Sequence, residues 1–102
     1  MPVRRELCNG FGILHGGMSF LLADSAMAFA SNAHEVTALA SSASIEWLAP
    51  VAEGRVVTAV AEQRWTNGRS AIWDVAITDD TGTTVAVFRG TTRRVVPPAA
   101  AG

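Results

Sequence analysis

The residues of this 102-residue chain that could do chemistry lie close together near its beginning. Asn9 precedes a glycine-rich loop, His15-Gly16-Gly17 ends that loop, and Asp24 follows eight residues after Gly16. Residues 18–31 contain no proline or glycine and many alanines and leucines, which predicts a helix beginning near Gly16 or Gly17. The first N–H groups of a helix lack partners within it and carry the positive end of its dipole. They suit a carbonyl oxygen that becomes an oxyanion.

Asp24 is the only ionisable residue of this otherwise apolar helix. Such a carboxylate is either a structural group, bonded to a neighbour such as Ser25, or a working one, and we expect it to work as a general base or nucleophile. Eight residues of helix separate Gly16 from Asp24 by about 12 Å, so one reacting carbon atom cannot contact both. If both act on it, they come from different subunits whose helices lie side by side across a two-fold axis.

The periodicity changes from helical to alternating after the predicted helix, which indicates β-strands. The Asn67-Gly68 pair is typical of a tight hairpin. The strands are predicted over residues 37–48, 55–65, 69–78 and 83–96. In the second of them one face is expected to carry Val57, Ala59, Ala61 and Trp65. A helix that is apolar on all sides is expected to be buried, and Gly90 is expected at a bend or a close approach of another backbone.

One helix followed by four antiparallel strands makes an α+β protein in which the sheet must curl around the helix, the hotdog arrangement. Residues 1–96 are predicted to form one domain, and residues 97–102 a disordered tail. Because 49% of the residues are hydrophobic, we expect some apolar surface to lie in a subunit interface.

Composition excludes several classes of function. The net charge is −1 and no basic run is longer than Arg93-Arg94, which argues against binding of nucleic acid. No apolar run approaches the roughly 20 residues needed to span a bilayer. The single cysteine, Cys8, cannot form an intrachain disulfide, and no signal segment precedes it, so we expect a cytoplasmic protein.

The string Asn9-x5-His15-Gly16-Gly17-x2-Phe20-x-Leu22-Ala23-Asp24 resembles the signature of the PaaI-type acyl-CoA thioesterases of phenylacetate catabolism, a branch of the hotdog superfamily. Residues 26–32, 41–50 and 85–90 also resemble that family, so the similarity covers nearly all of residues 8–95. The resemblance implies a hotdog homodimer with composite active sites, commonly paired into a tetramer. It also implies hydrolysis of acyl-CoA thioesters, with aromatic acyl groups favoured. Family members have a longer stretch ahead of the Asn-containing loop, where this sequence has only residues 1–7.

The resemblance assigns roles to the site residues. Asp24 of one subunit activates water or attacks the thioester directly, while the Gly16 region of the partner subunit polarises the carbonyl. Asn9 assists carbonyl binding. His15 is a further catalytic candidate, although a histidine ahead of a helix is more often a hydrogen-bonding element. Neither a metal nor a redox cofactor is expected. The leaving thiolate, with a pKa of about 8.5, needs no dedicated strong acid to expel it.

Other residues are predicted to bind substrate. Gly17 and Ser25 neighbour the catalytic candidates. Ser41 and Ser42 occupy the strand that borders the acyl and pantetheine channel in the family. Gly68-Arg69 corresponds to a glycine and basic residue near the hairpin on the path of the coenzyme, where arginine would meet phosphate.

Two other functions compete with this prediction. A non-catalytic hotdog module that senses acyl-CoA would bind the ester without turnover, and the intact Asp24 counts against it. A hotdog dehydratase needs an Asp-x4-His arrangement. The only histidine after Asp24 is His34, ten residues later, so this function ranks last.

Overall fold

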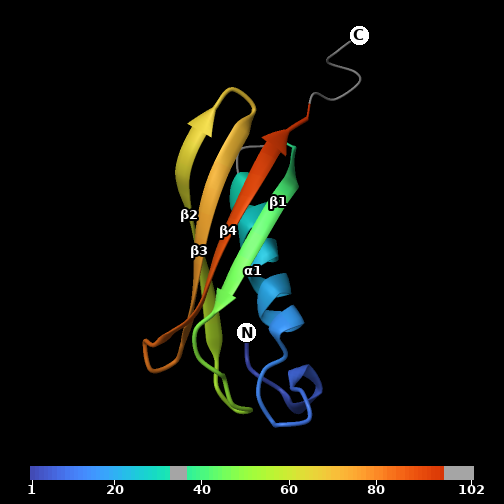
Figure 1. Cartoon of the computed structure of the whole chain (residues 1–102), viewed down its shortest axis with the longest axis vertical. Coiled ribbons are helices and arrows are strands. Elements are labelled where there is room, and N and C mark those ends of the chain that lie inside the picture. The colour runs from blue at the N-terminus through green and yellow to red at the C-terminus, as the bar shows by residue number, and fades with distance from the viewer. Residues whose placement is uncertain (33–36, 96–102) are drawn as a thin grey trace.

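A computed structural model describes residues 1–32 and 37–95. A short 3-10 turn η1 (Arg5–Leu7) precedes helix α1 (Gly16–Ser31). Four strands follow: β1 (Ala38–Trp47), β2 (Val57–Asn67), β3 (Ser70–Asp79) and β4 (Thr84–Arg94). They form one antiparallel sheet in the order β1-β4-β3-β2. Figure 1 shows the sheet curving along α1. The predicted α+β hotdog architecture is confirmed.

The element boundaries lie close to those predicted. Helix α1 begins at Gly16, and each predicted strand is present within about two residues at either end. Strand β2 extends to Asn67, which pairs directly with Ser70, because Gly68 between them has a positive φ of 60°. His34 and the predicted tail, residues 97–102, lie outside the described residues. In the described part of the chain, no helix is both long and apolar enough to cross a membrane.

The residues ahead of α1 lie beside the start of β2. Pro2 forms an isolated bridge with Val56, and the Val3 N–H donates to the Arg55 carbonyl at 2.7 Å. The residues ahead of the loop therefore form a single bridge followed by η1. These contacts bring the glycine-rich loop of residues 9–13 to the start of the helix.

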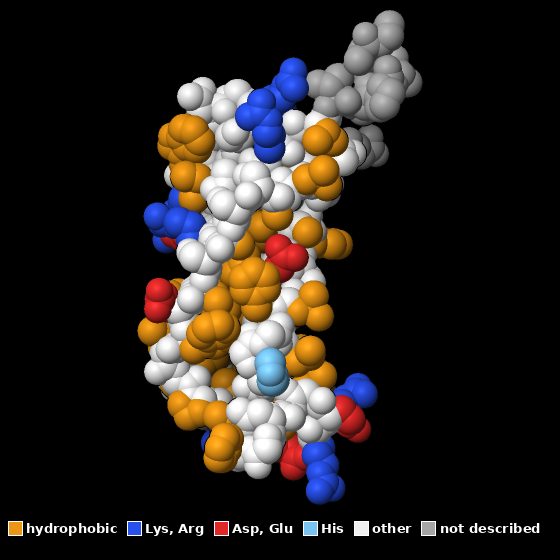
Figure 2. All heavy atoms as spheres, turned by 45° about the vertical axis from the view of Figure 1, so that its right-hand side comes forward, with side chains coloured by type: hydrophobic (Ala, Val, Ile, Leu, Met, Phe, Trp, Pro, Cys, Tyr) orange, Lys and Arg blue, Asp and Glu red, His pale blue; other side chains and the backbone are white. Residues whose placement is uncertain are grey.

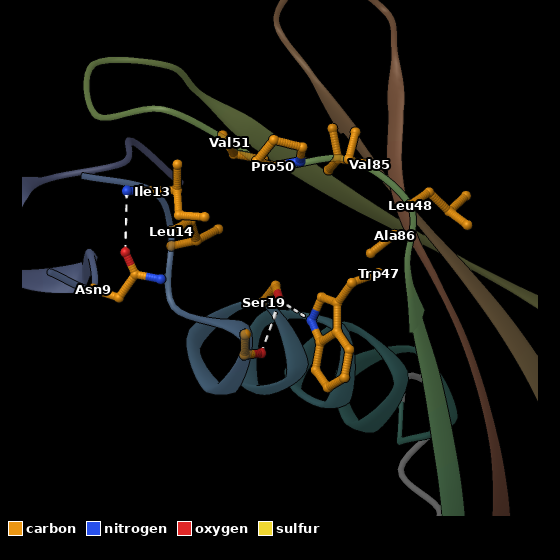
Figure 3. Close-up of a pocket in the computed structure, with 12 residues that line it drawn as sticks. Asn9, Ile13, Leu14, Ser19, Trp47, Leu48, Pro50, Val51, Val85 and Ala86 are labelled. Carbon is orange, nitrogen blue, oxygen red and sulfur yellow. Dashed lines mark hydrogen bonds between the residues drawn. The ribbon is translucent and has the colours of Figure 1, made fainter. Parts of the chain in front are cut away.

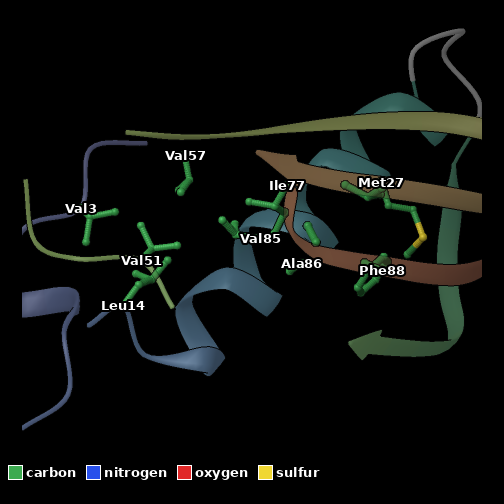
Figure 4. Packing of buried hydrophobic residues seen from close by; sticks show 11 residues of the cluster. Val3, Leu14, Met27, Val51, Val57, Ile77, Val85, Ala86 and Phe88 are labelled. Atoms are coloured by element: carbon green, nitrogen blue, oxygen red, sulfur yellow. The ribbon is translucent and has the colours of Figure 1, made fainter. Parts of the chain in front are cut away.

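The hydrophobic core lies between α1 and the sheet. The helix buries Ser19, Ala23 and Met27, which are spaced four residues apart and so share one face. Figure 4 shows Met27 reaching toward Phe88 of β4, with apolar side chains of the other elements continuing the cluster. A Cβ at Gly90 would meet the Met27 sulfur, so this glycine is required by the close approach of a side chain rather than a backbone.

The other face of α1 differs from prediction. Leu21 is 56% exposed and Phe29 84% exposed, so the expected burial on all sides is wrong for the single chain. The physical reason is that the sheet covers only one side of the helix. Figure 2 shows apolar side chains along this side of the molecule with an acidic side chain among them.

Two of the three register shifts in the sheet, those in β1 and β2, turn side chains to the opposite face. Between Gln63 and Trp65 the pairing of β2 with β3 shifts by one residue, and Trp65 lies opposite Ile72. The prediction that Trp65 shares a face with Val57 is therefore wrong, because the extra residue reverses the alternation. A similar shift occurs in β1 between Ala40 and Ser42.

Candidate active site

The start of α1 leaves one backbone donor free. The Gly17 N–H donates to His15 Nδ1 at 2.9 Å, and the Met18 N–H donates to the His15 carbonyl at 2.9 Å. Among the described residues no acceptor is present for the Gly16 N–H. His15 therefore caps the helix through its side chain, which fits its interpretation as a hydrogen-bonding element.

Trp47, the last residue of β1, lies against this helix start. Its indole Nε1–H donates to Ser19 Oγ at 2.9 Å, and that hydroxyl donates to the Gly16 carbonyl at 2.8 Å. A Cβ at position 16 would lie 3.0 Å from Trp47 Cε2. Glycine at position 16 therefore lets the indole lie against the backbone.

A cavity of about 410 Å³ opens beside Gly16. Figure 3 shows side chains from the loop, the helix and the β1 end pointing into it. Most of its walls are apolar. The lining residues are Asn9, Ile13, Leu14, Gly16, Ser19, Trp47, Leu48, Ala49, Pro50, Val51, Val85 and Ala86. Such a space suits an apolar ligand group, and Gly16, whose N–H lacks an acceptor among the described residues, forms part of its wall.

Asn9 belongs to the same cavity. Its Oδ1 accepts from the Phe11 N–H at 2.9 Å, which holds the loop in a turn. Figure 3 also shows the longer bond from the Ile13 N–H to the same oxygen. With that oxygen engaged, the amide Nδ2 is left as the donor, and within residues 1–32 and 37–95 it has no acceptor. Asn9 and Gly16 therefore each present an unused donor at one cavity.

Asp24 lies away from that cavity. It is half-buried on α1 and does not line the cavity beside Gly16. In the described part of the chain its carboxylate has no hydrogen bond or ion pair, with Ser25 or with any other residue. The structural alternative, in which Ser25 holds the carboxylate, is therefore absent from the single chain.

Comparisons with known proteins identify the family to which the chain belongs. A sequence model of the thioesterase superfamily matches residues 11–86. The chain belongs to the thioesterase superfamily. It is 37% identical over 95 residues to acyl-coenzyme A thioesterase PaaI of Escherichia coli (strain K12), covering 93% of this chain and 68% of PaaI. The predicted family and the predicted class of enzyme, a thioester hydrolase, are confirmed.

Solved structures of the superfamily share the fold of this thioesterase. The E. coli PaaI structure has a TM-score of 0.91 at 36% identity and covers 94% of this chain and 70% of its own. The TT0310 protein of Thermus thermophilus has a TM-score of 0.87 at 36% identity, with coverages of 92% and 79%. A Streptococcus pneumoniae TIGR4 thioesterase protein solved with coenzyme A shares the fold at a TM-score of 0.89, 23% identity and coverages of 93% and 77%.

The remaining predicted substrate-binding residues of this thioesterase lie elsewhere in the single chain. Ser41 is the extra residue of β1, and its hydroxyl donates to the Thr91 carbonyl at 3.3 Å. Ser42 is exposed and lies opposite Thr91. Gly68 and Arg69 form the β2–β3 hairpin, at the end of the molecule opposite the helix start (Figure 1). Only Gly17 and Ser25, both exposed on α1, share the helix of the catalytic candidates.

Two residues of the site were not assigned to it from sequence. They are Trp47 and Ser19. A sequence signal for Trp47 exists, because it ends a strand immediately before the Leu48-Ala49-Pro50 segment that continues the cavity wall. Ser19 carries no such signal, since a serine inside a helix has little effect on helix stability and does not by itself indicate a function.

Proposed function

We propose that this thioesterase hydrolyses the thioester of an acyl-CoA, with a preference for aromatic acyl groups of the phenylacetyl type. The observation that carries the proposal is the unused Gly16 N–H at the wall of an apolar cavity, joined there by Asn9. The similarity to a protein named acyl-coenzyme A thioesterase supports the thioester, and the neighbour solved with coenzyme A supports the CoA moiety. The aromatic preference rests on the resemblance to phenylacetate-catabolism enzymes.

The proposed active site is composite. Gly16 and Asn9 line the cavity, and Asp24 lies about 12 Å farther along the same helix, so the carboxylate comes from a second copy. The exposed residues Gly17, Leu21 and Ser25 lie four apart and form one stripe on α1. If two antiparallel copies of α1 pack with their two-fold axis at Leu21, Asp24 of the partner subunit lies within about one helical turn of Gly16, measured along the helix.

The proposed chemistry follows from this placement. The Gly16 N–H and the Asn9 amide donate to the carbonyl oxygen as it gains negative charge. Asp24 of the partner subunit takes a proton from water, which adds to the carbonyl carbon, and the carbon–sulfur bond then breaks to release the CoA thiolate. Direct attack by Asp24, giving an anhydride that water hydrolyses, uses the same groups. Neither route uses a metal or redox cofactor.

The proposed oligomer also bears on the predicted CoA-binding residues of the β2–β3 hairpin. Gly68 and Arg69 are remote from the cavity of their own chain, so we propose that they contact CoA bound to another subunit. Arginine suits that role because its guanidinium pairs with phosphate. Two such dimers are proposed to form a homotetramer.

The function is tested by trapping the free thiol released from a panel of acyl-CoA esters. We expect turnover of phenylacetyl-CoA and hydroxyphenylacetyl-CoA, with a higher kcat/KM than for acetyl-CoA or hexanoyl-CoA. Absence of thiol release from every ester would contradict the proposal. Saturable binding by calorimetry in that case would identify a non-catalytic acyl-CoA sensor instead.

A further inference from the structure

The peptide that carries the Gly16 N–H is held from both sides. On its carbonyl side, His15 accepts from the Met18 N–H at 2.9 Å and from the Ser19 N–H at 3.3 Å. On the other side, the Gly16 carbonyl accepts from Ser19 Oγ at 2.8 Å. Ser19 thus bonds the two carbonyls that flank the Gly16 N–H, that of His15 through its backbone N–H and that of Gly16 through its hydroxyl.

Ser19 is in turn held by Trp47. The serine is 5% exposed, and its hydroxyl accepts from the indole Nε1–H while it donates to Gly16. Trp47 is 58% exposed, so this hydrogen bond and the contact with Gly16 fix an indole that solvent would otherwise leave free. The chain of contacts ties the end of β1 to the first turn of α1.

We infer that Ser19 and Trp47 are positioning residues, which set the direction of the Gly16 N–H toward the oxyanion. The inference rests on the proposed function. A donor stabilises an oxyanion only when it points at the place where the charge develops, so loss of direction lowers kcat more than it raises KM. Because the indole acts through the hydroxyl, removing either bond disturbs the same donor.

The test uses Trp47→Phe, which keeps an aromatic ring but removes the N–H, together with Ser19→Ala and the double variant. The matched control is Trp73→Phe, because the Trp73 Nε1–H also donates at 2.9 Å, to Thr92 Oγ1 in the sheet. Steady-state kinetics with phenylacetyl-CoA, thermal melts and the amide resonance of Gly16 are measured for each.

We expect Trp47→Phe and Ser19→Ala each to lower kcat about 10-fold with less than a twofold change in KM. This loss is smaller than that caused by removing an oxyanion donor altogether, because the donor is misdirected but still present. The double variant should lose about as much as Ser19→Ala alone, since the two bonds form one chain. The Gly16 amide resonance should shift in both variants, while Trp73→Phe should change the melting temperature but neither kcat nor that resonance.

Unchanged kcat in both single variants would overturn the inference while leaving the proposed function intact. An equal loss of kcat in Trp73→Phe would also overturn it, because the effect would then be general destabilisation. If Trp47→Phe does not fold, the kcat and the Gly16 amide resonance of Ser19→Ala alone test the inference. Absence of turnover by the wild-type chain would overturn the proposed function and this inference together.

Discussion

Asp24 lies eight residues beyond Gly16 on α1, and only Gly16 of the two lines the cavity at the helix start. The separation of about 12 Å follows from the rise of an α-helix. It is too long for both groups to reach one carbonyl carbon within a single chain. Since the exposed stripe of Gly17, Leu21 and Ser25 lies on the same stretch of helix, a second helix packed on that stripe would bring the two groups together.

Replacement of Asp24 by Asn should lower kcat at least about 100-fold, because an amide neither accepts the proton from water nor attacks the thioester. The melting temperature should stay near that of the wild type, since the carboxylate forms no hydrogen bond in the described part of the chain. Glu46→Gln, which neutralises an exposed carboxylate of β1, should leave kcat unchanged. Full activity of Asp24→Asn would refute the assigned role.

Replacement of Leu21 by Arg should dissociate the dimer. The substitution places two like charges opposite each other at the proposed two-fold axis, and it removes the apolar contact there. Sedimentation should report a smaller assembly than that of the wild type, and activity should fall in step with the loss of the helix-packed dimer. Val60→Arg is the control, because Val60 is 62% exposed but lies on β2, away from the helix. An active Leu21→Arg monomer would contradict a composite site.

The interior of the domain allows a prediction at Gly90. A Cβ there would meet the Met27 sulfur, and would lie 2.9 Å from Phe88 Cε1, in a fully buried setting. Gly90→Ala should therefore lower the free energy of unfolding by about 1–3 kcal/mol through overpacking. Gly10→Ala should have almost no effect, since nothing lies within 4 Å of the added carbon. Urea unfolding of both variants checks this, and equal midpoints would disprove the packing argument.

Stability should depend on pH through Asp74. Hydrogen bonds, above all those from Arg89 at 2.6 and 2.8 Å, hold the pKa of Asp74 below its ordinary value of 3.8. Because the pKa is lowered in the folded state, the ionised carboxylate of Asp74 stabilises the fold above pH 3.8. This stabilisation is lost as the pH falls through the folded-state pKa. Asp74→Asn should therefore melt a few degrees lower than the wild type near pH 7, and the gap should narrow below pH 3.8. A gap independent of pH would exclude this linkage.

Local patterns in the sequence predicted the parts of the fold that depend on neighbouring residues. The glycines and the apolar run placed the helix start at Gly16, and Asn67-Gly68 placed the hairpin. The extra residues in β1 and β2 could not be predicted, because a bulge depends on the register with the neighbouring strand. For the same reason Ser42 and Trp65 face away from where alternation alone would put them.

The candidate site likewise has residues that the sequence predicts and contacts that it does not. Asn9, Gly16 and Asp24 could be named from residue type and spacing, and their separation predicted the need for a partner. The contact of Trp47 with Gly16 joins residues 31 positions apart and arises from the curvature of β1 toward the helix. No local pattern encodes that distance, so the bond from Trp47 to Ser19 required the structure.

Mixing two inactive variants tests the composite site most directly. Gly16→Pro removes the donor at the first position of the helix, where proline is tolerated, and displaces the Trp47 indole that contacts this position. Asp24→Asn removes the carboxylate. Each variant should be folded, dimeric and inactive alone. After unfolding and refolding at a 1:1 ratio, about half of the dimers are mixed, and each holds one intact site of two. The account predicts recovery of about one quarter of wild-type activity, and no recovery in a folded, mixed dimer would contradict it.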